Sequence, residues 1–354
     1  MKILVFNVAA ESAGALSILN SAHNAAFRTD DHEWLFIVST PTLEEAPQLR
    51  VKRFPWVKKS WLHRLWFDAF MAPRIVRAEQ PHAVVSLQNV SIPRVRQRQI
   101  VYLHTALPFS SYRFDLRKEP GAWLYQRLIT QLIRRSTASA NEIVVQAPWM
   151  SRTISDISGI EQSRIEVIRP VVSQSGPSER YRPTPDNRRR FFFPAGAISY
   201  KNHELIFAAA EQLQREGTHV EIVCTITHED LRSLGITRTP GNVQLLGEIP
   251  FHEVQRRYTE SVLVFPSLLE TVGLPLMEAQ AQQTFVLAAD LPYARDATAG
   301  YDNAHFFDPH VPGELAAMMT SVANGSLPYS TAAAPPASQQ SDPWDAFISL
   351  VTDS

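Results

Sequence analysis

The chain has 354 residues, 45% of them apolar, and its 34 Lys and Arg almost balance its 35 Asp and Glu, leaving a formal net charge of −1. This length exceeds one typical core and predicts two globular domains, while the charge gives no global case for nucleic-acid binding. The single cysteine, Cys224, excludes an internal disulfide and a cysteine-based zinc cluster, and it fits a reducing compartment.

The first half of the chain alternates apolar runs with helical patterns, which predicts a parallel α/β sheet. Residues 3–8 form an almost continuous apolar run, as expected for a central strand covered on both faces. A small-residue turn containing Gly14 leads from this strand to a helix, but it is not a G-x-G-x-x-G fingerprint, so a dinucleotide is not supported. Further strands are expected within residues 34–39, 81–89, 99–104, 142–146 and 165–170. Functional side chains collect at strand carboxyl ends in such sheets, where His104 lies.

Two segments of the first half mix cationic side chains with aromatic residues of the kind found at interfaces. Residues 51–70 interleave five Lys and Arg with six Trp and Phe, and residues 112–135 contain a similar mixture. One interpretation is a surface that binds an anionic membrane. The other is a pair of amphipathic helices whose aromatic residues enter the core while the cations remain solvated. The near-neutral net charge does not decide between them.

The second half repeats the α/β pattern after a polar stretch. Residues 173–190 contain three prolines and no hydrophobic period, so we expect a linker. Strands are then expected near residues 191–193, 219–226, 242–246, 262–265, 285–290 and 305–307, and residues 227–230 are expected to begin a helix rather than to bind a metal. Residues 325–341 are rich in Ala, Pro and Ser and are expected to be mobile. A final helix is expected after Asp342, which suits a cap, with Pro343 at the first position.

The most informative stretch joins the strand 262–265 to a helix. Glu270 lies in the turn, Gly273 and Pro275 follow, and Glu278 lies in the first turns of the helix. Unpaired backbone N–H groups and the helix dipole make this helix start suitable for a phosphate. The two carboxylates can accept hydrogen bonds from sugar or ribose hydroxyls.

The residues Pro266-Ser-Leu-Leu-Glu270-Thr-Val-Gly-Leu-Pro-Leu-Met-Glu278-Ala279 resemble the E-x7-E signature of family 4 glycosyltransferases, including those of bacterial surface-polysaccharide synthesis. The resemblance implies a retaining enzyme of the GT-B fold, with two Rossmann-like parallel-sheet domains facing a central cleft. It places an acceptor-side domain at residues 1–172, the linker at 173–190 and a nucleotide-sugar-binding domain at 191–330. A terminal helix within 341–354 is expected to return toward the first domain.

The resemblance also implies roles for single residues. Lys201 would offset the diphosphate charge, Glu270 would bind the donor-sugar hydroxyls, and Glu278 would hold the ribose. His104 would contact the donor sugar or its phosphate from the other domain, so the expected catalytic set is His104, Lys201 and Glu270. The remaining donor-binding positions act through their backbones: Gly14, Gly247, Val272, Gly273 and Leu274.

The expected substrates are a UDP- or GDP-sugar and a glycan or lipid-linked acceptor, with no metal and no other cofactor. The expected location is cytoplasmic, with peripheral binding to the cytoplasmic membrane face left open. Departures from the family pattern include the lack of a glycine adjacent to Gly14 and the replacement of the usual arginine before Lys201 by Gly196 and Ala197. These departures motivate an alternative, a GT-B-shaped nucleotide-sugar-binding or scaffold protein that has lost transfer. A phosphorylase or an epimerase on the same fold is a further alternative.

Overall fold

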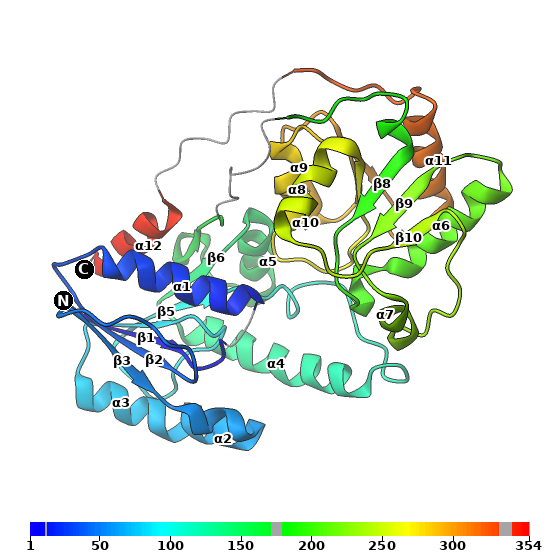
Figure 1. Cartoon of the computed structure of the whole chain (residues 1–354). Helices are drawn as coiled ribbons and strands as arrows, with labels where there is room; N and C mark the ends of the chain where they lie inside the picture. The colour runs from blue at the N-terminus through cyan, green and yellow to red at the C-terminus, as the bar shows by residue number, and fades with distance from the viewer. Residues whose placement is uncertain (11–12, 171–178, 333–341, 354) are drawn as a thin grey trace. The chain divides into compact units, whose positions relative to one another are not determined.

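The computed structural model describes residues 1–10, 13–170, 179–332 and 342–353. These residues form two compact units, the first built from the chain up to residue 171 together with residues from 340 onward, and the second from residues 172–339 (Figure 1). Part of the predicted linker (173–178) and part of the predicted mobile stretch (333–341) lie outside the described residues. Within the described ranges, no helix has the length and hydropathy needed to cross a bilayer.

Unit 1 is built on a parallel sheet with the strand order β3-β2-β1-β4-β5-β6-β7. The predicted strands are present. Their bounds are β1 Lys2–Asn7, β2 Glu33–Val38, β3 Leu49–Arg53, β4 Ala83–Ser86, β5 Arg98–Leu103, β6 Glu142–Val145 and β7 Ile165–Val167. The helices are α1 Ala13–Phe27, α2 Trp61–Trp66, α3 Ala72–Glu79, α4 Pro120–Ser139, α5 Pro148–Ser158 and α12 Pro343–Thr352, with a π-helical segment, Phe67–Met71, joining α2 to α3.

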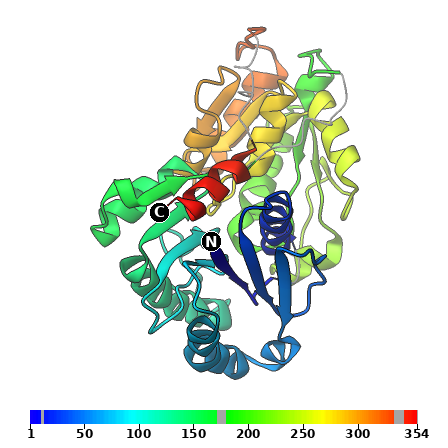
Figure 2. The ribbon, with the colours of Figure 1, turned by 90° about the vertical axis from the view of Figure 1, so that its left-hand side faces the viewer.

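Strand β1 is buried on both faces, as its apolar run predicted. Ile3 and Val5 belong to a core cluster with residues of α1 and α12 on one face of the sheet. Leu4 and Phe6 belong to a second cluster with residues of the π-helical segment and α3 on the other face. Figure 1 and Figure 2 show α12, in red, close to α1, on the side of the sheet away from α3. The alternation of side chains along a strand thus distributes one apolar run between two cores.

Helix α12 returns to unit 1 and completes its core. Asp342 caps the helix by accepting a hydrogen bond from the backbone N–H of Trp344 at 3.0 Å, as the sequence predicted. The Trp344 ring stacks on Tyr102 of β5 with centroids 5.7 Å apart. At the other end of the helix, the Arg98 guanidinium donates to the Leu350 carbonyl at 2.8 Å, where a cation also complements the helix dipole.

Strand β3 was not predicted, and it includes the first residues of the segment 51–70, in which cations alternate with aromatic residues. Residues 49–53 pair with β2 at the edge of the sheet, so Lys52 belongs to a strand and its ammonium bonds to Glu79 at 2.6 Å. The aromatic rings of Phe54 and Trp56 pack against a core cluster. Lys58 donates to the Ala9 carbonyl at 2.8 Å. From residue 59 onward the segment combines exposed apolar side chains, such as Trp61, with the fully buried Phe67.

Unit 2 has a second parallel sheet, with the order β10-β9-β8-β11-β12-β13. Its strands are β8 Arg190–Phe193, β9 Glu221–Cys224, β10 Val243–Leu245, β11 Val262–Phe265, β12 Val286–Ala289 and β13 Ala304–Phe307. Its helices are α6 His203–Arg215, α7 His228–Ser233, α8 Phe251–Glu260, α9 Leu274–Ala281, α10 Pro292–Ala297 and α11 Pro312–Ala323. The strand order reverses direction between β8 and β11. Ligands of open α/β sheets bind beside such a reversal, outside the carboxyl ends of the strands.

Candidate functional site

The loops that follow β8 and β11 lie at the strand-order reversal of unit 2 and carry most of the predicted site residues. The first loop ends in a short 3₁₀ turn, Ser199–Lys201, and the second runs from Pro266 to the start of α9. The backbone N–H of Leu268 donates to the Tyr200 carbonyl at 2.7 Å, which ties the two loops together. The two loops are therefore held together at this edge of the sheet.

Lys201 and Glu270 form an ion pair in this site. The Lys201 ammonium lies 2.5 Å from a Glu270 carboxylate oxygen, and both side chains are largely buried, with exposures of 17% and 15%. The ammonium also lies over the rings of Tyr200 and Phe265 at 5.7 and 5.8 Å. Burial, reinforced by the charge of Lys201, lowers the pKa of the adjacent His203 to about 4, so His203 is neutral near pH 7. Lys201 therefore carries the positive charge at this position.

Asn202 fixes the shape of the Lys201 loop. Its backbone has a left-handed conformation with φ of 61°, which asparagine tolerates better than most residues. Its side-chain amide donates to the carbonyls of Pro309 at 2.9 Å and Pro266 at 3.3 Å. One side chain thus joins the loops after β8, β11 and β13. The sequence alone does not indicate this role.

Gly273 caps the amino end of α9 in a conformation that glycine favours. Its φ is +78°, and a Cβ at this position would lie 3.1 Å from Leu276 Cδ1 and 3.2 Å from the Tyr293 ring. The Tyr293 hydroxyl donates to the Ser267 carbonyl at 2.6 Å and so supports the same loop. Val272 is buried and Leu274 is exposed, so these two side chains point in different directions while their backbones form the helix start.

Glu278 lies one turn into α9 and has a partner that the sequence does not indicate. The hydroxyl of Tyr258, on α8, donates to Glu278 Oε2 at 2.9 Å. Burial raises the pKa of Glu278, and the hydrogen bond from Tyr258 partly opposes this rise. An aromatic residue in an amphipathic helix is typical of a core position, so the sequence alone gives no reason to connect Tyr258 to the site.

Gly247 lies at the same edge of the sheet, after β10. Its φ is +71°, and a Cβ would approach Thr227 Cγ2 to 3.2 Å. Its backbone N–H donates to the Ile226 carbonyl at 3.1 Å. Thr227 itself caps α7 in a reciprocal arrangement with Asp230, so residues 227–230 begin a helix as predicted.

His104 and Gly14 belong to unit 1, and the structure describes them separately from the unit 2 residues. Gly14 lies in the first turn of α1, and a Cβ there would meet nothing within 4 Å. A side chain at this position would therefore meet no steric obstacle within the described part of unit 1. Residues 11 and 12 of the predicted turn lie outside the described residues.

His104 follows β5 and is held by Asn89. The His104 backbone N–H donates to Asn89 Oδ1 at 2.8 Å, so the Asn89 amide nitrogen is the donor to His104 Nε2 at 2.9 Å. Burial lowers the pKa of His104, and a hydrogen bond to the Leu87 backbone partly opposes that change. Asn89 has a left-handed backbone with φ of 66°. Contact between Nε2 and a donor sugar would require the Asn89 bond to be exchanged.

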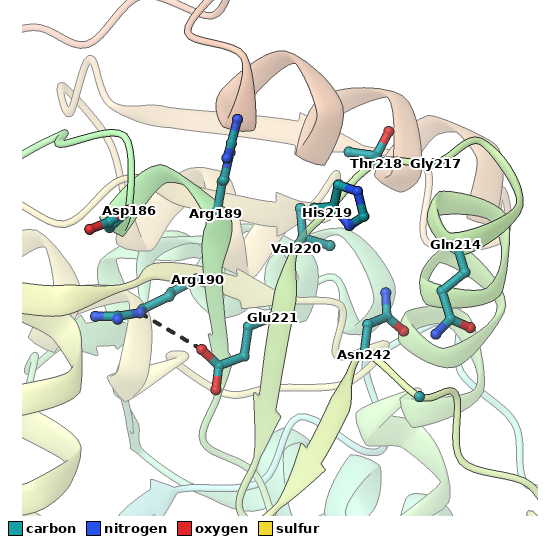
Figure 3. Close-up of a pocket in the computed structure, with 11 residues that line it drawn as sticks. Asp186, Arg189, Arg190, Gln214, Gly217, Thr218, His219, Val220, Glu221 and Asn242 are labelled. Carbon is teal, nitrogen blue, oxygen red and sulfur yellow. Dashed lines mark ion pairs between the residues drawn. The ribbon is translucent and has the colours of Figure 1, made fainter.

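A hollow of about 570 Å³ lies at the opposite, amino edge of the unit 2 sheet (Figure 3). It lies beside the first residues of β8 and β9, where Arg190 and Glu221 form an ion pair at 3.7 Å. Its two arginines, Arg189 and Arg190, are exposed. The two predicted glutamates lie at the other edge, so the geometry favours the carboxyl-end site. Across the described ranges, no three His, Cys, Asp or Glu side chains are grouped to hold a metal.

Comparisons with known proteins cover this part of the chain. Residues 179–333 match the family model for "Glycosyl transferases group 1", and this range contains the whole carboxyl-end site of unit 2. The chain is 21% identical over 230 residues to the O-antigen chain mannosyltransferase RfbU of Salmonella typhimurium. That match covers 64% of this chain and 61% of the relative, so it spans less than two thirds of the relative's length.

Two solved structures share the fold over almost the full chain. One is the lipopolysaccharide outer core galactosyltransferase WaaB in its apo form, with a TM-score of 0.68 and 15% identity, covering 99% of each chain. The other is Anabaena Alr3699/HepE in complex with UDP-glucose, with a TM-score of 0.60 and 15% identity, covering 99% of this chain and 95% of that one. The chain has the GT-B fold that the sequence predicted, and its residues 179–333 match the model of the group 1 glycosyl transferases.

Proposed function

We propose that the protein is a retaining glycosyltransferase that moves a sugar from a UDP- or GDP-sugar to a glycan or lipid-linked acceptor in polysaccharide synthesis. The observation that carries the proposal is the Lys201–Glu270 pair at the strand-order reversal, beside the helix start that bears Glu278. A cation, two carboxylates and unpaired backbone N–H groups at one edge suit a diphosphate joined to two sugars. The named relatives, a mannosyltransferase and a UDP-glucose complex, support the same class.

In this mechanism the described residues bind and orient the donor and neutralise the charge of its diphosphate. Lys201 would exchange its bond to Glu270 for the donor diphosphate and stabilise the charge that grows on the leaving phosphate. Glu270, released from Lys201, would accept hydrogen bonds from the sugar hydroxyls, and Glu278 would accept them from the ribose. The backbones of Val272, Gly273 and Leu274 would contact the sugar and phosphate, and that of Gly247 the nucleobase. No carboxylate is assigned as a covalent nucleophile, and no metal is required: the leaving phosphate would help to remove the acceptor proton on the same face.

Nucleotide binding tests the proposal first. Thermal unfolding is followed with UDP, GDP, ADP and their sugar conjugates, because a ligand that binds only the folded state raises its stability. One nucleotide family should stabilise the protein, and Glu278→Gln should reduce this shift. Glu216→Gln is the control, since Glu216 lies at the carboxyl end of α6 and not on α9. This variant should leave the shift unchanged. The absence of any shift at millimolar ligand would contradict the proposal.

We also propose that the protein binds the cytoplasmic membrane face through an apolar surface of unit 1, here called the α2–α4 surface. Its exposed members on α2 and the π-helical segment are Trp61, Leu62, Leu65, Trp66 and Phe70, and those on α4 are Leu124, Tyr125, Leu128 and Leu132. Trp61 is 70% exposed and Leu128 60%, values unusual for large apolar side chains. The charge of Arg64 acts on Tyr125, so the two helices are neighbours, as Figure 1 shows.

The composition of the α2–α4 surface favours a membrane over a folded protein partner. It includes a hollow of about 520 Å³ lined by α2 and the π-helical segment, and it is flanked by the exposed cations Lys59, Arg127 and Arg135. Interfacial tryptophans with flanking cations suit anionic headgroups. A lipid-linked acceptor would be met at such a surface. The cytoplasmic location is proposed on the single, buried thiol of Cys224 together with the nucleotide-sugar donor.

Sedimentation with liposomes tests the membrane proposal. The protein should pellet with vesicles that contain phosphatidylglycerol and remain in the supernatant with phosphatidylcholine alone. Trp61→Ser with Trp66→Ser should abolish pelleting. Phe251→Ser removes an exposed apolar ring from unit 2, where it is 48% exposed, and should have no effect. Equal recovery of the wild-type protein in the supernatant with both vesicles would refute membrane binding.

A further inference from the structure

Tyr258 is a buried side chain whose position is fixed by the core around it. It is 1% exposed, and its ring packs edge-on against Phe192 of β8 with centroids 5.9 Å apart. Its backbone carbonyl accepts a hydrogen bond from the Thr284 hydroxyl at 2.7 Å. Ring and backbone are therefore both restrained, and the hydroxyl has a defined direction. That hydroxyl reaches Glu278 Oε2 at 2.9 Å.

Glu278 consequently offers its two carboxylate oxygens to different partners. Oε2 accepts from Tyr258, while within the described part of the chain no side chain or backbone group donates to Oε1. A free glutamate loses up to about 2 kcal/mol of rotamer entropy when it is ordered. The hydrogen bond from a fixed tyrosine removes part of that cost before any ligand arrives.

We infer that Tyr258 is a positioning residue that holds Glu278 so that Oε1 faces the ribose hydroxyls of the nucleotide, and that it thereby sets the preference for ribose over deoxyribose. The inference rests on the proposed function, since it takes the ligand of Glu278 to be a nucleotide ribose. Tyr258 touches Glu278 and not the reacting atoms, so its effect is on nucleotide binding and recognition.

The same hydrogen bond affects the charge of the carboxylate. A hydroxyl that donates to a carboxylate favours the ionised form, and burial disfavours it. Burial alone would raise the pKa of Glu278 further than burial and Tyr258 together. Removing the Tyr258 hydroxyl therefore raises this pKa, and ribose binding that needs ionised Glu278 is lost at a higher pH than in the wild-type protein.

Tyr258→Phe is the test, because it keeps the ring and removes one oxygen. Affinities for UDP, GDP and ADP and for the 2′,3′-dideoxy form of whichever binds are measured by calorimetry from pH 4 to pH 8. The variant should bind the ribonucleotide about tenfold more weakly, as expected for one hydrogen bond to a charged group, and bind the dideoxy form as the wild type does. The midpoint of the acid-side loss of ribonucleotide binding should move to higher pH.

Tyr301→Phe is the matched control. Tyr301 is also buried, and its hydroxyl donates to the Thr284 carbonyl at 2.6 Å, so this variant loses a comparable bond in which Glu278 takes no part. It should lower the melting temperature without changing the nucleotide preference or the pH midpoint. Equal weakening of ribo and dideoxy forms by Tyr258→Phe, or no weakening of either, would overturn the inference while leaving the proposed function intact. A wild-type protein that binds no nucleotide would instead overturn the proposed function, and the inference with it.

Discussion

Replacing Gly273 with alanine should damage both the stability of unit 2 and its nucleotide site. The left-handed φ of +78° costs a residue with a Cβ about 1–2 kcal/mol. The added Cβ would also lie 3.1 Å from Leu276 and 3.2 Å from the Tyr293 ring. Both neighbours are buried, so they have little room to move, and overpacking of this kind adds about 1–3 kcal/mol. The sum is a loss of about 2–5 kcal/mol.

A variant at Gly300 separates the backbone cost from the packing cost. Its φ is +76°, nearly the same as that of Gly273, but a Cβ there would meet nothing within 4 Å. Gly300→Ala should therefore show the backbone cost alone, about 1–2 kcal/mol, equivalent to roughly 2–8 °C in melting temperature for a unit of this size. Urea unfolding, followed by fluorescence, gives the free-energy difference between the two variants.

Nucleotide binding provides the second measurement on the same pair. Gly273→Ala displaces the backbone at the start of α9 and should weaken nucleoside diphosphate binding at least tenfold, since the proposed contacts there are made by the backbone. Gly300→Ala should bind as the wild type does. Equal stability losses in the two variants, with equal affinities, would refute the packing argument and the placement of the site.

Three further changes test the charges described above. Lys201→Met should weaken the binding of a nucleoside diphosphate more than that of the free nucleoside, as measured by calorimetry. Adding Glu270→Gln should restore stability, because the single variant leaves a buried carboxylate without its cation. Equal losses of affinity for the two ligands would contradict this role of Lys201. Arg98→Ala should speed hydrogen exchange in α12, because the carbonyls at its end lose their donor; unchanged protection would count against that role. Bonds from Lys2 and Lys52 lower the pKa of Glu79 from 4.5 to about 2, so the stability it adds is complete above pH 4.5 and is lost as the pH falls toward 2. Glu79→Gln should reduce the change in melting temperature between pH 5 and pH 2. An unaltered dependence on pH would argue against the pairing.

The fold was predictable because buried parallel strands leave a signal in a single sequence. Residues 3–8 and 262–265 are apolar runs, and each is a strand buried on both faces. Strand β3 was missed because Leu49–Arg53 is an edge strand, where Lys52 can reach Glu79 from the open side. A short strand that alternates cations with aliphatic residues has the same composition as an amphipathic surface segment.

The candidate site was only partly predictable, for a different reason. Glu270, Gly273 and Glu278 share one continuous stretch with a recognisable spacing. Asn89 and Tyr258 act through contacts with residues 15 and 20 positions away, and each has an ordinary local reading as a turn or a core residue. Only the pairing of β4 with β5, and the packing of α8 beside α9, brings them to their partners.

The docking of α12 on unit 1 has a consequence for the order in which the protein is made. Phe347 and Val351 belong to the same core cluster as Ile3 and Val5, yet the ribosome adds them only after the whole of unit 2. Unit 2 is one continuous segment and can fold as soon as it emerges. Unit 1 remains incomplete, with the apolar surface around Tyr102 uncovered, until α12 has been synthesised. During synthesis, chaperone binding should therefore concentrate on the first unit even though it leaves the ribosome first.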